Sequence, residues 1–98
     1  MEVDLIVTRN GYGFGGNWQL KATKNGETKS FYLGQDAKVC SRILGMTPKE
    51  LSTEVGSNDL NLIETRQSIA NLILEAVGVN EENEDEFMKL QPWEIAAE

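Results

Sequence analysis

Residues 18–33, WQLKATKNGETKSFYL, decide the fold. At their centre stands Asn25-Gly26, a preferred pair for a two-residue hairpin turn, because both central positions of a type I′ turn need a positive φ angle. The residues on either side alternate between apolar and polar types, which is typical of two strands with one buried face. The turn therefore predicts a hairpin with the following pairs: Lys24 with Glu27, Ala22 with Lys29, Leu20 with Phe31, and Trp18 with Leu33.

This register sorts the side chains of the hairpin onto two faces, since successive residues of a strand point to opposite sides. The predicted inner face carries Trp18, Leu20, Phe31 and Leu33. The predicted outer face carries Gln19, Lys21, Thr23, Thr28, Ser30 and Tyr32. Upstream, residues 2–9 (EVDLIVTR) alternate in the same way, with Val3, Leu5 and Val7 on one face, and predict a third strand.

The rest of the chain has helical patterns. Residues 36–45 carry apolar pairs four apart and end at Gly45, and residues 48–55 follow a capping box in which Thr47 is the N-cap and Glu50 the third helical residue. A third helix is expected over residues 60–77, where a wide apolar stripe predicts packing across the sheet. Its stripe contains Leu62, Ile69, Ile73 and Ala76, flanked by Ile63, Ala70, Leu74 and Val77.

These elements predict the α+β class, with a three-stranded antiparallel sheet over residues 2–33 packed against three helices. We expect residues 1–79 to form a single domain, followed by residues 80–98 as an acidic linker and an apolar tail. The linker is NEENEDE (80–86), and the tail carries Met88, Leu90, Trp93 and Ile95. Side chains this apolar favour a tail that docks on its own domain or on a partner.

Composition limits the functions that the chain can perform. The 98 residues carry a net charge of −7, contain no histidine and contain one cysteine. Residues 1–45 carry a charge of +2 and residues 46–98 a charge of −9. Undirected nucleic-acid binding is disfavoured, because phosphate neutralisation supplies most of its affinity, whereas the acidic half suits a basic partner surface. We expect a cytoplasmic location, because the only cysteine, Cys40, has no internal disulfide partner, and the sequence shows neither a secretory signal nor a membrane span.

The stretch RNGYGFGGNW (9–18) is the first candidate for a functional site. It contains G-x-G-x-x-G, but a strand is expected after it, where a dinucleotide fold requires a helix. The order strand, glycine loop, strand resembles the nucleotide loop of protein kinases. The lysine, catalytic loop and metal-binding aspartate that kinase activity needs are missing, so the sequence excludes that activity.

Two further resemblances cover short segments. Gly11-Tyr12-Gly13-Phe14 is similar to the RNA-contacting strand of cold-shock and RRM domains, whose rings stack on bases; Gly15 departs from that pattern, and no second aromatic motif is present. Residues 45–66 resemble a helix-turn-helix segment. Its second helix would present Asp59 and Glu64 to DNA phosphates, so we favour two short helices leading into a core helix.

The sequence therefore predicts a non-enzymatic, acidic interaction protein whose partner is a protein. In size and acidity it has the general style of small phage-type inhibitors of host nucleic-acid-handling or defence machinery. The alternative is a protein that binds or sequesters a nucleotide, with loop amides as an anion nest beside Arg9, Lys21 and Tyr32. No cofactor, metal or catalytic residue is expected, homo-oligomers are an open possibility, and the candidate binding residues are Arg9, Gly11, Tyr12, Gly13, Phe14, Gly16, Lys21, Tyr32 and Trp93.

Overall fold

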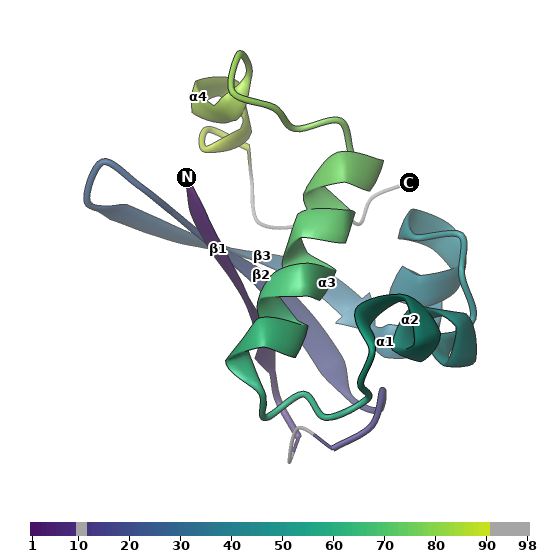
Figure 1. Ribbon diagram of the computed structural model, residues 1–98. Helices are drawn as coiled ribbons and strands as arrows, with labels where there is room; N and C mark the ends of the chain where they lie inside the picture. Colours follow the sequence, from purple (N-terminus) through teal and green to yellow (C-terminus); the bar gives the residue numbers. More distant parts are fainter. Residues whose placement is uncertain (10–11, 91–98) are drawn as a thin grey trace.

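The three strands form one antiparallel sheet in the order β1-β2-β3, and the helices lie on one side of it (Figure 1). The computed structural model describes residues 1–9 and 12–90. The strands are β1 (Glu2–Val7), β2 (Asn17–Lys24) and β3 (Glu27–Gln35). The predicted α+β class and the three-stranded antiparallel sheet are confirmed.

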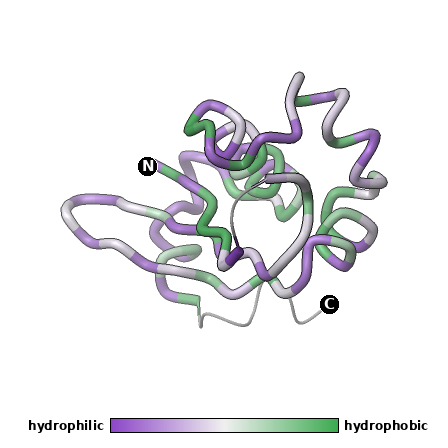
Figure 2. Tube along the Cα trace, turned by 90° about the horizontal axis from the view of Figure 1, so that it is seen from below, coloured by the Kyte–Doolittle hydropathy of each residue, from purple (hydrophilic) through white to green (hydrophobic). Residues whose placement is uncertain are grey.

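The hairpin turn forms as predicted, with Asn25 at φ 53° and Gly26 at φ 80°. The predicted pairing is confirmed from Lys24 and Glu27 through Leu20 and Phe31, and the four inner side chains are fully buried. The tip of the hairpin projects from the rest of the chain and is mostly hydrophilic (Figure 2).

The predicted pair Trp18 with Leu33 is wrong, because Trp18 lies opposite Gly34. A bulge at this point gives β3 one extra residue, and Gly34, at φ 93°, adopts a conformation that side-chain-bearing residues avoid. Trp18 and Leu33 nevertheless both point into the core.

The helix predicted over residues 36–45 is not a regular α-helix. After α1 (Asp36–Lys38) the chain widens into a π-helix, η1 (Val39–Ile43), in which the amide of Leu44 donates to the carbonyl of Val39 at 3.1 Å. The consecutive residues Val39 and Cys40 are both fully buried. The four-residue spacing of the sequence did not indicate this wider turn.

Helix α2 (Pro48–Val55) begins and ends as predicted. The hydroxyl of Thr47 accepts from the amide of Glu50 at 3.2 Å, and Gly56 ends the helix at φ 77°. These contacts satisfy one free amide at the helix start and supply the left-handed residue that commonly follows a helix.

Helix α3 (Ile63–Ala76) packs across β1, as predicted, with Ile69, Ala70 and Ile73 buried. It begins three residues later than expected, and the predicted stripe is too wide, because Leu62, Ile63 and Val77 are exposed. Residues 56–62 separate α2 from α3, which is longer than the three- or four-residue turn of a helix-turn-helix motif.

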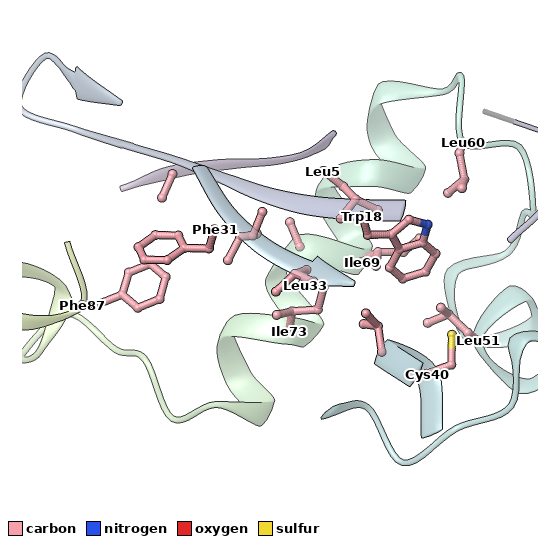
Figure 3. Close-up of a cluster of buried hydrophobic side chains, with 14 residues drawn as sticks. Leu5, Trp18, Phe31, Leu33, Cys40, Leu51, Leu60, Ile69, Ile73 and Phe87 are labelled. Carbon is pink, nitrogen blue, oxygen red and sulfur yellow. The ribbon is translucent and has the colours of Figure 1, made fainter. Parts of the chain in front are cut away.

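Trp18 and Phe31 anchor the two ends of the core (Figure 3). The indole of Trp18 lies beside Leu5 and Ile69, although none of the described residues accepts a hydrogen bond from its Nε1–H. At the other end, the ring of Phe31 packs on that of Phe87 with centroids 4.5 Å apart.

Phe87 directly follows the segment that the sequence marks as a linker, residues 80–86. It ends the short helix α4 (Glu84–Phe87) and is 4% exposed. Two lysines of the hairpin hold this segment: Lys29 Nζ donates to the carbonyl of Met88 at 2.9 Å, and Lys24 Nζ lies 3.3 Å from a carboxylate oxygen of Asp85. Residues 84–88 therefore pack on the hairpin.

Replacing Gly26 with alanine tests the turn. The new Cβ meets no atom within 4 Å, so the cost is backbone strain alone, and we expect the free energy of unfolding to fall by about 1–2 kcal/mol. Gly15→Ala is the matched control, because Gly15 also has open space around it and does not have a positive φ. Urea unfolding curves measure both; equal stability of the two variants would contradict the assigned turn.

Candidate functional site

The glycine-rich loop between β1 and β2 is closed at its base by Thr8 and Asn17. The amide of Thr8 donates to the carbonyl of Asn17 at 3.1 Å, and the amide of Asn17 donates to the hydroxyl of Thr8 at 3.3 Å. These bonds continue the strand pairing one step beyond Val7, so the loop leaves the sheet in a defined direction.

The loop is fastened to the connection between α2 and α3. The amide of Gly13 donates to the carbonyl of Asn58 at 2.9 Å, and Tyr12 forms an isolated antiparallel bridge with Asp59. The expectation that the loop amides stay available for an anion is therefore wrong for Gly13. Residues 12–16 form a loop rather than the aromatic strand of a cold-shock or RRM platform.

The α2–α3 connection is ordered by its own polar side chains. The amide of Asp59 donates to the hydroxyl of Ser57 at 3.1 Å, and the amide of Asn61 donates to the Asp59 carboxylate at 2.9 Å. Side-chain turns of this kind fix the backbone before a helix begins. They also explain why α3 begins at Ile63 rather than at residue 60.

Arg66 ties the same connection to the sheet. Its Nη1 donates to the carbonyls of Leu60, at 2.9 Å, and Asn61, at 3.0 Å, and its Nε lies 3.1 Å from Oδ1 of Asp4 on β1. The ion pair is partly exposed and contributes little by its charge alone. Its effect is positional, because one planar side chain fixes three backbone or carboxylate oxygens relative to one another.

These contacts bring together, at one end of the molecule, two segments that carry exposed apolar side chains, which we call the Tyr12 surface: Tyr12, Leu62 and Ile63. They are 68%, 46% and 51% exposed, respectively. Tyr12 is bridged to Asp59, and the amide of Leu62 donates to the carbonyl of Asp59 at 3.2 Å, so both lie next to one residue. Figure 2 looks toward this end, which lies at the bottom of Figure 1.

Three of the predicted site residues support the loop from inside. Phe14 packs edge-on against Trp18, with ring centroids 6.0 Å apart. Gly16 lies under the aliphatic stem of Arg9, and a Cβ added at residue 16 would come within 3.0 Å of Arg9 Cγ. The carbonyl of Gly16 accepts a hydrogen bond from the backbone amide of Asp36. Phe14, Gly16 and the stem of Arg9 thus hold the loop in place.

Lys21 and Tyr32 lie elsewhere, on the face of the sheet that no described helix covers (Figure 1). Lys21 is opposite Asp4, three residues before the end of β1 and so about 10 Å along that strand from Val7. The structure therefore does not bring Arg9, Lys21 and Tyr32 together around the loop. Two further predicted residues, Gly11 and Trp93, lie outside the described residues.

Leu62 and Ile63 are binding candidates that sequence reasoning assigned to the core. The available signal was the run Ser57-Asn58-Asp59, whose short polar side chains favour turns over helix. Because of this turn, Leu62 lies before the helix and Ile63 is its first residue, and both side chains stay exposed.

The described residues contain no group of three or more Asp, Glu, Cys or His side chains placed to hold a metal ion. Cys40 is fully buried, and burial, together with the nearby Asp36 carboxylate, raises the pKa of its thiol to about 11. A thiol in this environment is a poor nucleophile, because the thiolate is the reactive form.

Comparisons with known proteins identify no relative. No protein-family model matches the sequence, and neither the curated proteins nor the solved structures contain a match. None of the helices in the described part of the chain is long and apolar enough to cross a membrane.

Alkylation of Cys40 tests its environment. We expect iodoacetamide to leave the folded protein unmodified at pH 8 and to label the urea-unfolded chain rapidly, because folding both buries the thiol and raises its pKa. The unfolded chain releases this proton near pH 9 and the folded protein near pH 11, so stability should decline across that interval. Rapid labelling of the folded protein, followed by mass spectrometry, would contradict the assignment.

Proposed function

We propose that this protein is a non-enzymatic binding protein that recognises a protein partner through the Tyr12 surface. The observation that carries the proposal is the gathering of Tyr12, Leu62 and Ile63, three of the large apolar side chains that the described chain exposes, at one end of the fold. Large exposed apolar clusters on small soluble domains often serve as interaction sites.

The chemistry of this surface suits a binding hot spot. Tyrosine combines a large apolar ring with a hydroxyl, and it is enriched among the residues that dominate interface energies. The Gly13–Asn58 bond and the Tyr12–Asp59 bridge fix the surface before a partner arrives. A surface that is already ordered loses less conformational entropy on binding, so more of the contact energy remains as affinity.

The charges near this surface suggest the character of the partner. Asp59 and the exposed Glu64 lie beside it, and residues 46–98 as a whole carry a charge of −9. We therefore propose a partner with an apolar pocket and a basic rim, because opposite potentials steer association and fix register. Proteins that handle nucleic acids present basic surfaces, which is the reason for proposing a phage-type inhibitor of host nucleic-acid-handling or defence machinery. Action in the cytoplasm is part of this proposal.

The nucleotide-binding alternative gains no support from the geometry. It needs loop amides and cations that converge on one anion, whereas the amide of Gly13 is bonded to Asn58 and Lys21 lies along the sheet.

Alanine substitution tests the Tyr12 surface. Tyr12→Ala and Ile63→Ala should each weaken partner capture from the native host, by roughly 30-fold if the residue is a hot spot, while thermal unfolding changes little because both side chains are largely exposed. Tyr32→Ala is the matched control, since Tyr32 is 48% exposed but lies on the sheet. Quantitative mass spectrometry of proteins retained on immobilised variants gives the readout. The proposal would be contradicted if Tyr12→Ala and Ile63→Ala capture the partner as well as the unmodified protein does. If Tyr32→Ala alone loses capture, the binding site lies on the sheet instead.

A further inference from the structure

A second feature of the molecule, separate from the Tyr12 surface, is a cleft at the opposite end of α3. It lies where the chain turns from α3 toward α4 (Figure 1) and has a volume of about 440 Å³. Three segments contribute its apolar walls: Ile43 from η1, Ala76, Val77 and Val79 from the end of α3 and the turn after it, and Phe87 and Leu90 from α4 and the residues that follow.

Polar side chains line the cleft beside the apolar ones, among them Asn83. Arg42 and Glu86 also line it, and both are exposed. Val77 is 38% exposed although the sequence places it in the apolar stripe of α3. Six of the ten lining residues are apolar, and a cleft of this size has room for one large side chain.

The chain itself supplies a suitable side chain close by. Leu90 is both a wall of the cleft and the last described residue, and the sequence continues with eight residues, QPWEIAAE. Trp93 follows Leu90 by only three residues, so its backbone can lie at most about 11 Å away. An indole that is attached this close has a high effective concentration at the cleft, unlike a side chain from another molecule.

We propose that this cleft is the docking site for Trp93 of the same chain. Tryptophan has the largest apolar surface of any side chain in the tail, and its indole N–H can remain at the polar edge. The next residue in the sequence, Glu94, is acidic, and Arg42 in the lining is a cation with which a docked tail could pair, although Glu86 lines the cleft as well. The inference does not depend on the Tyr12 surface, because it concerns the other end of α3.

Fluorine NMR of the full chain labelled with 5-fluorotryptophan tests the proposal. The protein has two tryptophans, and Trp93→Phe assigns their resonances. We expect both Trp18 and Trp93 to show small shifts between H2O and D2O, which indicates that neither ring is exposed to solvent. The same result should hold on dilution, because the contact is within one chain.

Two arginine substitutions, one directly after α3 and one directly before it, locate the contact. Val77→Arg places a charge on the cleft wall and should expose Trp93 while leaving the Trp18 resonance unchanged. Leu62→Arg is the matched control, since Leu62 is also a partly exposed apolar residue next to α3 but lies at the other end, and it should alter neither resonance. Trp93→Ala should lower the melting temperature by roughly 10 °C or more.

Three results would overturn the proposal. The first is a solvent-exposed Trp93 in the unmodified protein, the second is protection of Trp93 that disappears on dilution, and the third is protection that persists in Val77→Arg. If Val77→Arg also shifts the Trp18 resonance, the substitution has disturbed the fold. The proposal is then judged by the solvent exposure of Trp93 in the unmodified protein and by its dependence on dilution.

Discussion

The fold depends on the inward alternation of the β2–β3 hairpin. A two-residue turn at Asn25 and Gly26 fixes which side chains face the helices, and a slip of one residue would expose Leu20 and Phe31 and bury Lys21 instead. Burying a large apolar side chain stabilises the folded chain by about 1.5–3 kcal/mol relative to leaving it exposed, so exposing these two would remove a large share of the roughly 5–15 kcal/mol by which a domain is stable. Helices α2 and α3, η1 and the segment around Phe87 all pack on this one face.

The same constraint positions both candidate sites at opposite ends of α3. At the start of the helix, Trp18 supports Phe14, and the loop that follows β1 reaches the α2–α3 connection. At its end, Phe31 receives Phe87, which brings the chain after α3 back over the hairpin and forms one wall of the cleft. Trp18 and Phe31 therefore help to position the Tyr12 surface and the cleft, although both sites are formed mainly by residues outside the hairpin.

Local signals predicted the parts of the fold that local interactions determine. Turn chemistry gave the hairpin, and the cap at Thr47 gave the start of α2. The bulge at Gly34 and the π-helical turn at Val39 were not predicted, because the two-residue and four-residue spacings of apolar residues in the sequence do not mark them. The candidate site was predicted in part. Tyr12 was identified from the glycine-rich loop, whereas Ile63 was missed, because its exposure depends on a turn that delays α3 and on a contact between segments about 45 residues apart in the sequence.

The central claim is that the loop is held against the α2–α3 connection and presents an ordered apolar surface. Hydrogen exchange of individual amides, followed by NMR, tests it most directly. The amide of Gly13 should exchange roughly tenfold more slowly than that of Gly15, because Gly13 donates to Asn58 and none of the described residues offers Gly15 an acceptor. Exchange of both amides at the same fast rate would show that the loop is not fastened and would contradict the account.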